Sequence, residues 1–321
     1  MIDIANELFV EGDYLDMYPD VREAILDGRF PDGYSHYKKH GKSEGRLPNK
    51  KNFISRQDKI LFGVNKAGLG LEIGPSHNPV APKREGFNVH ILDVESQEGL
   101  RAKYQGHGVN LDNIEPVDFV WDGRPLSKLI GKTHCYDYII ASHVIEHVPD
   151  FITFLRECEQ LLTFNGVLTL VVPDKRYCFD YFSPLTSTGD VIDAWIEKRT
   201  KPSPGQIFDY FSNSAKRGEA IAWANDGVGG ATKLSHEFHE AKFYLQKAID
   251  SQEYIDVHCW RFIPSTFELI ISDLNKLDFL NLNIVKQFET SGCEFYISLS
   301  KKIAAVEFDR LNQLEKILLG A

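Results

Sequence analysis

The chain has 321 residues, 43% of them hydrophobic, a formal net charge of −10 at pH 7 and a sequence pI near 5.6. This length exceeds the usual size of one domain, so we expect one main domain with an accessory segment or insertion. The acidic balance argues against a general nucleic-acid binder, because such surfaces carry clustered positive charge.

The five cysteines are widely spaced and form no CxxC pair. This pattern argues against a disulfide framework and against a zinc–thiolate site. The N-terminus carries acids where a secretory signal carries basic residues, and no apolar run approaches the length of about 18 residues that a membrane span needs. We therefore expect a cytoplasmic protein with reduced thiols and no membrane span.

Residues 1–50 differ from the rest of the chain. Apolar positions over 14–26 have helical spacing, glycine and proline interrupt the pattern at 28–33, and a second short helix is expected over 34–40. We interpret 1–50 as an N-terminal helical module and 51–321 as the main domain.

Strands and helices alternate in the main domain. Strands are expected at 69–73, 88–93, 117–121, 136–142 and 166–172, with helices near 96–104 and 150–163. Such alternation predicts an α/β fold with a doubly wound, mainly parallel sheet and right-handed crossovers.

The alternation stops over residues 174–260, which are too long for an ordinary loop and contain several prolines between helical pieces. We interpret this stretch as a substrate-binding lid inserted after the fifth strand. Regularity returns with a helix that starts at Pro264 and two strands at 280–288 and 294–299.

The first strand ends in a glycine turn, Leu71-Glu-Ile-Gly74, with an acid just before it. Asp93 closes the second strand, 21 positions after Glu72, close to the spacing of a ribose-binding acid in doubly wound folds. The turn lacks the G-x-G-x-x-G pattern that binds a pyrophosphate. A ligand with a ribose and no pyrophosphate, such as S-adenosylmethionine, fits better.

Five segments, in order, resemble the motifs of class I S-adenosylmethionine-dependent methyltransferases. They are Leu71–Gly74, Leu92–Asp93, Val120–Gly123, Tyr136–Asp150 and Leu161–Val172. The resemblance covers roughly 65–175 and implies a Rossmann-like, seven-stranded methyltransferase that ends in an antiparallel hairpin and uses S-adenosylmethionine. The residues that it places at the cofactor are Glu72, Gly74, Pro75, Asn78, Asp93, Trp121, Asp122, Gly123, Ser142, His143 and His147.

Within this set, Asp93 would accept hydrogen bonds from the ribose hydroxyls and Glu72 would lie beneath the methionine end. Asp122 would accept from the adenine amine, or it is an ordinary turn acid before Gly123. Glu146 and His147 are expected to be structural or to line the cofactor pocket.

His143-Val-Ile-Glu-His147 also matches H-x-x-E-H, the inverted zinc-peptidase signature. That mechanism needs the motif inside a long helix, whereas here it follows a strand directly and Pro149 comes soon after. We therefore expect no metal ion.

The candidate catalytic residues are His143, His236 and His239, because a histidine base suits an alcohol acceptor. His143 could instead fix the turn after its strand. His236 and His239 could be substrate ligands, half of a metal site or surface histidines.

The candidate substrate-binding residues are Asp174, Lys175, Arg176, Tyr177 and His258. The first four follow the fifth strand, where open α/β sheets bind ligands. A local salt-bridged turn is the alternative for this charged run.

Two segments of the N-terminal part, Tyr18–Val21 and His36–Arg46, resemble a small helical module that recurs beside bacterial glycosyltransferases and methyltransferases of surface polysaccharide assembly. The module would be a helical hairpin docked on the main domain or on a second protomer, or it would bind glycan directly. A homodimer or a glycosyltransferase is its expected partner.

Together these patterns predict an S-adenosylmethionine-dependent methyltransferase that O-methylates a sugar hydroxyl of a glycan or glycolipid intermediate. A small metabolite or an amine as acceptor, or a non-catalytic scaffold that binds the cofactor in glycan assembly, are the alternatives.

Overall fold

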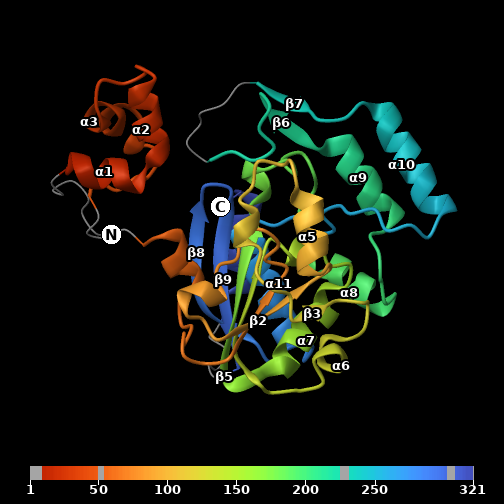
Figure 1. Ribbon diagram of the computed structural model, residues 1–321. Coiled ribbons are helices and arrows are strands. Elements are labelled where there is room, and N and C mark those ends of the chain that lie inside the picture. The colour runs from red at the N-terminus through yellow and green to blue at the C-terminus, as the bar shows by residue number, and fades with distance from the viewer. Residues whose placement is uncertain (1–8, 50–53, 225–230, 302–307, 321) are drawn as a thin grey trace.

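The computed structural model describes residues 9–49, 54–224, 231–301 and 308–320. Its centre is a seven-stranded sheet with the order β3-β2-β1-β4-β5-β9-β8 (Figure 1). The strands are β1 (Gly70–Ile73), β2 (Val89–Asp93), β3 (Phe119–Val120), β4 (Tyr136–Ser142), β5 (Leu162–Pro173), β8 (Asn283–Ser291) and β9 (Glu294–Ser300). The first five are parallel and β9 runs antiparallel to both neighbours. The predicted doubly wound sheet with a final antiparallel hairpin is confirmed.

The inner strands are apolar on both faces because helices or loops cover both faces. Successive side chains of a strand point to opposite faces, and in β4 this places Ile139 in one buried cluster and Ile140 in the other. The larger cluster includes side chains of α7 (Phe151–Leu161) and α11 (Pro264–Lys276). Burial of these runs explains why the sequence pattern located β1, β2, β4 and β5 correctly.

Outside the segment predicted as a lid, the other α-helices described for the main domain are short. They are α4 (Arg56–Ile60), α5 (Gln97–Tyr104), α6 (Leu126–Ile130) and α12 (Arg310–Leu318). The sequence did not predict α6 or α12. α12 packs against α11, where Gln313 donates to the carbonyl of Ser265 and to Glu268, both at 2.8 Å.

The strand order reverses between β1 and β4, which lie side by side although β2 and β3 follow β1 in the chain. In open α/β sheets, ligands bind at such a switch point, outside the carboxyl ends of the strands. The residues that follow β1, β2, β4 and β5 therefore define where a site is expected.

The segment predicted as a lid contains α8 (Thr188–Ile196), α9 (Pro204–Asn213), β6 (Ala215–Arg217), β7 (Thr232–Leu234) and α10 (Phe238–Asp250). In Figure 1, α9, α10, β6 and β7 gather at the end of the molecule opposite α6. α8 differs, because its Val191 and Ala194 are fully buried in the core with α7 and α11. The first helix of the segment is thus part of the main core, and the small β6–β7 sheet was not predicted.

Residues 9–49 form a helical unit with its own core of Tyr14, Met17, Val21 and Tyr37. Its elements are α1 (Glu11–Met17), α2 (Pro19–Leu26), α3 (Gly33–His36) and a π-helical turn at Tyr37–Gly41. The helix predicted over 14–26 is divided before Pro19, which has no N–H to continue a helix. No helix among the described residues has the length and apolar character needed to cross a membrane.

The two segments that resemble a recurring module, Tyr18–Val21 and His36–Arg46, contact each other through Asp20 and Arg46. Arg46 donates to both carboxylate oxygens of Asp20, at 3.0 and 2.8 Å, and the hydroxyl of Tyr14 lies 3.0 Å from Nδ1 of His36. Such bidentate pairing fixes geometry as well as charge. The recurring residues therefore hold this unit together.

Candidate functional site

The turn after β1 brings backbone close to the segment after β4. Gly74 has φ 64° and Ser76 has φ 54°, both in the left-handed region. A Cβ atom on Gly74 would lie 2.9 Å from Cγ2 of Val144, closer than real Cβ contacts allow. Glycine is thus required here by both the backbone conformation and the space.

Asp93 ends β2 beside this turn and is only 4% exposed. Its Oδ2 accepts from the amide of Ser76 at 2.9 Å and its Oδ1 from the amide of Val94 at 2.8 Å. Burial raises the pKa of Asp93, and these two amides offset the rise only in part. Since each carboxylate oxygen has a second lone pair, Asp93 can still accept two hydroxyl hydrogens, as a ribose would supply. The turn and the acid fit the predicted nucleoside.

Glu72 lies beneath the same loop. Its two oxygens accept from the amides of Val80, at 2.6 Å, and Ala81, at 3.0 Å, and burial raises its pKa to about 7. Pro75 and Asn78 form a turn, with the amide of Asn78 donating to the carbonyl of Pro75 at 3.0 Å. Glu72 thus holds the loop that follows β1, and its contact with a cofactor stays a prediction.

The predicted adenine residues lie in an exposed turn after β3. Nε of Arg124 donates to both oxygens of Asp122, at 3.0 and 2.8 Å, and Nε1 of Trp121 donates to the carbonyl of Arg124 at 3.0 Å. Gly123 has φ 88°. Asp122 is therefore engaged within its own turn, which matches the alternative interpretation of an ordinary turn acid.

His143 follows β4 and lies between two carboxylates. Its Nε2 is 2.7 Å from Oε2 of Glu294, its Nδ1 is 3.4 Å from Oε1 of Glu146, and its φ is 54°. Burial lowers the pKa of His143, but the two carboxylates outweigh burial and raise it to about 10. At neutral pH the ring is an imidazolium, which has no free lone pair. This charge state argues against His143 as the general base.

A chain of opposite charges continues from His143 to the start of the main domain. Arg56 in α4 donates to both oxygens of Glu294, at 2.6 and 3.2 Å, and its Nη2 lies 3.4 Å from the hydroxyl of Ser142. Burial raises the pKa of Glu294, but His143 and Arg56 lower it to about 2. Glu294 was not predicted, since its sequence position 151 residues from His143 gives no spacing signal.

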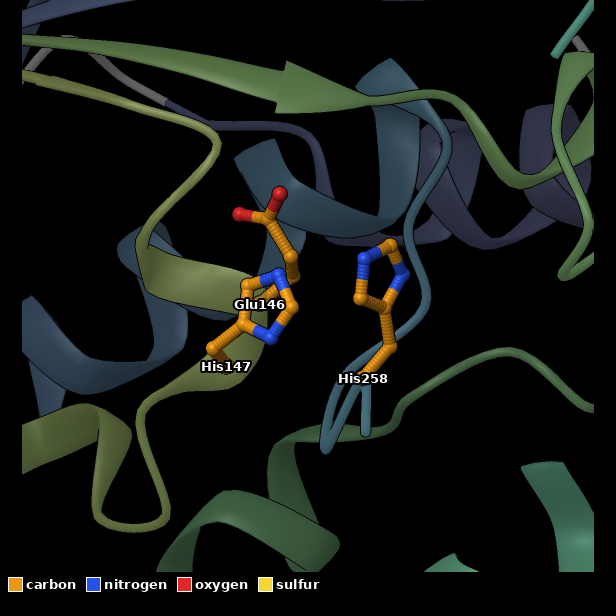
Figure 2. Close-up of side chains that lie close together, drawn as sticks. All are labelled: Glu146, His147 and His258. Atoms are coloured by element: carbon orange, nitrogen blue, oxygen red, sulfur yellow. The ribbon is translucent and has the colours of Figure 1, made fainter. Parts of the chain in front are cut away.

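Next to His143, three side chains converge beyond the end of β4: Glu146, His147 and His258 (Figure 2). Glu146 is fully buried, and the two histidine rings meet edge to face with centroids 4.7 Å apart. Burial raises the pKa of Glu146, but the surrounding histidines outweigh burial and lower it below its ordinary value. The carboxylate therefore stays ionised.

Each of these histidines is held by an outer carboxylate. Nδ1 of His147 lies 2.8 Å from Oδ1 of Asp256, and Nδ1 of His258 lies 2.5 Å from Oδ2 of buried Asp180. His147 lowers the pKa of Asp256, and His258 with Arg261 lowers that of Asp180 against the effect of burial. Both acids are ionised acceptors, so each Nδ1 carries the proton, and Nε2 is the nitrogen that remains for another partner.

Burial lowers the pKa of His147, but Asp256 and Glu146 outweigh burial and raise it. The cluster thus attracts positive charge.

Backbone contacts fix the cluster. The amide of Cys259 donates to the carbonyl of Glu146 at 2.7 Å, Nε1 of Trp260 donates to the carbonyl of Val148 at 2.6 Å, and the hydroxyl of Tyr254 donates to the carbonyl of His147 at 3.2 Å. The segment leading to α11 is therefore tied to the turn after β4. His258 was predicted to bind substrate, whereas Asp180 and Asp256 were not predicted at all.

The two other candidate bases lie elsewhere in the insertion. His236 packs on Phe211, with centroids 4.9 Å apart, and its Nδ1 lies 3.3 Å from Glu240. Two aromatic rings separate His236 from His258: His236 contacts Tyr210, Tyr210 contacts Phe179, and Phe179 contacts His258. His239 is exposed at the start of α10. The structure therefore brings His258, and not His236, to the residues after β4.

The charged run after β5 is mostly paired within itself. Buried Asp174 accepts from Arg176 Nε, at 3.0 and 3.2 Å, and Nη2, at 2.7 Å, and from Thr290 at 2.6 Å. Lys175 donates to the carbonyl of Tyr181, and the carbonyl of Tyr177 accepts from the amide of Trp223, both at 2.8 Å. This geometry matches the alternative of a local salt-bridged turn, and substrate contacts of these residues stay a prediction.

Comparison with known proteins places these features in a family. A family model described as "Methyltransferase domain" matches residues 53–227, more than half of the chain. The human "Ubiquinone biosynthesis O-methyltransferase, mitochondrial" is 31% identical over 122 residues, which cover 32% of this chain and 32% of that protein. The match thus spans about a third of the relative's length.

Among solved structures, the CcbJ methyltransferase from Streptomyces caelestis is 13% identical with a TM-score of 0.36, covering 77% of this chain and 96% of that one. An S-adenosylmethionine-dependent methyltransferase from Aquifex aeolicus is 12% identical with a TM-score of 0.34, covering 76% and 88%. The domain match shows that this chain belongs to the methyltransferase-domain family.

Proposed function

We propose that this protein transfers the methyl group of S-adenosylmethionine to a hydroxyl oxygen, and that the hydroxyl belongs to a sugar of a glycan or glycolipid intermediate. An alcohol must lose its proton as it attacks the methyl group. The observation that carries the proposal is the pair of carboxylate-held histidines, His147 and His258, beside the end of β4. Each has an Nε2 that is not used by its outer carboxylate, so the acceptor proton would leave at this cluster.

In this mechanism, bound S-adenosylmethionine supplies a methyl group that its sulfonium charge has already activated. Asp93 would hold the ribose hydroxyls by charge-assisted hydrogen bonds, and the turn at Gly74 would let the ligand approach the backbone. The cluster of Glu146, His147 and His258 would orient the acceptor oxygen in line with the S–CH3 bond.

The sugar is the more specific part of the proposal. It is supported by the resemblance of the N-terminal unit to a module found beside enzymes of surface polysaccharide assembly. A second candidate is the hydroxyl of a small metabolite, which the name of the human relative, a ubiquinone biosynthesis O-methyltransferase, favours. Both candidates use the same hydroxyl chemistry.

Methyl transfer is tested with purified enzyme, S-adenosylmethionine labelled in its methyl group, and three sets of acceptors: saccharides, phenolic or aliphatic metabolites, and amines. We expect label in an O-methyl ether, and loss of turnover in His258→Ala. Label restricted to metabolites would select the second candidate. Label only on amines would contradict hydroxyl transfer.

The cofactor site is tested by Asp93→Ala. Removal of two charge-assisted hydrogen bonds should weaken S-adenosylhomocysteine binding by roughly 3 kcal/mol, about 100-fold. Isothermal titration calorimetry gives the Kd. Asp112→Ala, at an exposed acid, is the control and should bind as wild type does. If Asp93→Ala bound as tightly as the control, the ribose assignment would be wrong.

A further inference from the structure

We propose that Glu146, His147 and His258 form a binding site for one divalent transition-metal ion of the zinc class. One ligand atom from each side chain lies within 4.8 Å of the others, and Figure 2 shows the three side chains close together. This proposal departs from the sequence-based expectation that the enzyme has no metal.

The Glu146 carboxylate is the first reason. The side chain is fully buried, and neither oxygen has a hydrogen-bond partner among the described residues. His143 Nδ1 makes an ion-pair contact with Oε1 at 3.4 Å, and Oε2 has no such contact among the charged groups described. A buried carboxylate that lacks hydrogen bonds is costly. A cation coordinated by this carboxylate would remove that cost.

The outer carboxylates are the second reason. Histidines that bind metals usually donate their other ring N–H to a carboxylate or carbonyl, which fixes the tautomer and aims the free nitrogen. Both histidines of the cluster have this arrangement, His147 with Asp256 and His258 with Asp180. Asp256 and Asp180 thus support the two histidines from outside, and both Nε2 atoms are available as ligands beside the buried Glu146 carboxylate.

The donor set selects the ion. Two imidazole nitrogens and one carboxylate oxygen suit zinc and its neighbours better than Mg²⁺ or Ca²⁺, which prefer oxygen. Three protein ligands are also the number that leaves a coordination position open for water or substrate. Zinc bonds of about 2.0–2.1 Å place tetrahedral ligands roughly 3.3 Å apart. Metal binding therefore requires the present spacing, which is within 4.8 Å, to close toward that value.

The site differs from the two other metal sites that the sequence suggests. In the peptidase motif, His143 and His147 would be co-ligands, but Nε2 of His143 is bonded to Glu294. His236, the other half-site candidate, lies beside Glu240 in α10. From the H-x-x-E-H motif, only Glu146 and His147 are ligands of the proposed site. His258, near the C-terminal end of the insertion, is the third ligand.

The role of the ion rests on the proposed function, although the binding site itself does not. With both Nε2 atoms bound to it, a metal ion with an open position would replace them as the group that activates the acceptor. It would bind the acceptor oxygen and lower its pKa, so that the hydroxyl loses its proton to water close to neutral pH. Removal of the metal would then slow methyl transfer without weakening cofactor binding.

The test is metal binding in the absence of cofactor and acceptor. The full-length protein is treated with a chelator, desalted and titrated with Co²⁺, which is followed by its visible ligand-field absorption and by isothermal calorimetry, and then with Zn²⁺ as competitor. We expect one Co²⁺ per chain, displaced by Zn²⁺, and a rise in Tm that grows with metal concentration.

Variants identify the ligands. His147→Ala and His258→Ala should each weaken Co²⁺ binding by more than the roughly 10–100-fold that loss of an outer partner costs. Asp256→Asn should weaken binding within that range. His239→Ala is the matched control and should bind as wild type does. Because His147 is partly exposed, its variant is expected to fold even if substitution of buried His258 prevents folding.

Two outcomes would overturn the proposal. One is a wild-type protein that binds no Co²⁺ or Zn²⁺ beyond weak association. The other is binding that survives in His147→Ala and is lost in His239→Ala, which would move the site to α10. Either result can occur with the methyltransferase fully active, so failure of the metal site is distinguishable from failure of the proposed O-methylation.

Discussion

The ionisation of His143 follows from its neighbours. Its ring lies between the Glu146 and Glu294 carboxylates, and Arg56 balances the far side of Glu294. The left-handed backbone at His143, unusual for a residue other than glycine, aims the ring at this pair of acids. His143 therefore acts as a fixed positive charge that joins β4 to β9.

Glu294→Gln tests this description. Loss of one adjacent negative charge should lower the pKa of His143 from about 10 by roughly 1–2 units. The Cε1 proton of His143, assigned in an NMR pH titration, reports the midpoint. Glu289→Gln, at an exposed position of β8, is the control. Equal midpoints in the two variants would show that Glu294 does not set the charge of His143.

The same pair makes stability depend on pH. The raised pKa of His143 stabilises the fold below its ordinary value of 6.5, and the effect is lost as pH rises through about 10. The lowered pKa of Glu294 stabilises the fold above 4.5, and the effect is lost as pH falls through about 2. Between these ordinary values both contributions are complete. There the urea midpoint of wild type should exceed that of Glu294→Gln by the largest margin.

At the scale of elements, the turn after β1, which we propose as part of the cofactor site, is constrained by both its backbone conformation and the space around Gly74. Gly74→Ala should destabilise the protein by roughly 1–2 kcal/mol because of its left-handed φ, and further because its Cβ would meet Val144. Gly86 has φ 82° and open space around it, so Gly86→Ala carries only the first cost. Urea unfolding should rank wild type, Gly86→Ala and Gly74→Ala in decreasing stability.

A double variant separates the two causes. Gly74→Ala with Val144→Ala removes the steric contact and keeps the φ cost, so in urea unfolding the double variant should lose less stability than the sum of the two single variants. Strictly additive losses would mean that backbone conformation, and not the contact with Val144, excludes a side chain there.

The fold was largely predictable because its inner strands β1, β2, β4 and β5 are mostly buried, apolar runs. The end of β2 at Asp93 and the start of α11 at Pro264 could be predicted from neighbouring residues alone. The hairpin of β6 and β7 was missed because these strands are three residues each and rich in basic side chains. α12 was missed because it is amphipathic and mostly exposed, with only Gln313 buried.

The glycine turn after β1 could be predicted from the sequence, and its contact with a cofactor stays a prediction, but the cluster beyond β4 could not be predicted. Its outer partners Asp180 and Asp256 lie 78 and 109 residues from the histidines that they contact. No periodicity links such positions. They meet because the insertion leaves the sheet after β5 and returns beside the turn that follows β4, which is a property of the tertiary fold.

At the scale of the whole molecule, the chain combines a sheet domain and a helical unit that has its own core. The contacts that hold residues 9–49 together, including the pair of Asp20 and Arg46 and the cluster around Tyr14, lie within the unit. Counting from the N-terminus, Arg56 in α4 is the first described residue of the main domain that contacts the site, through Glu294. This division suggests that cofactor binding and the helical unit are separable.

Deletion of residues 1–49, with Arg56 retained, tests that separation. We expect an unchanged Kd for S-adenosylhomocysteine, because Gly74, Asp93 and their hydrogen-bond partners all lie in the main domain. If the unit recruits glycan or a partner, KM for a saccharide acceptor should rise while kcat and the Kd of the cofactor stay constant. Sedimentation velocity of the full-length chain and of the deletion variant shows whether deletion also dissociates a dimer. A large loss of cofactor affinity in a folded deletion variant would contradict the division and place the helical unit at the active site.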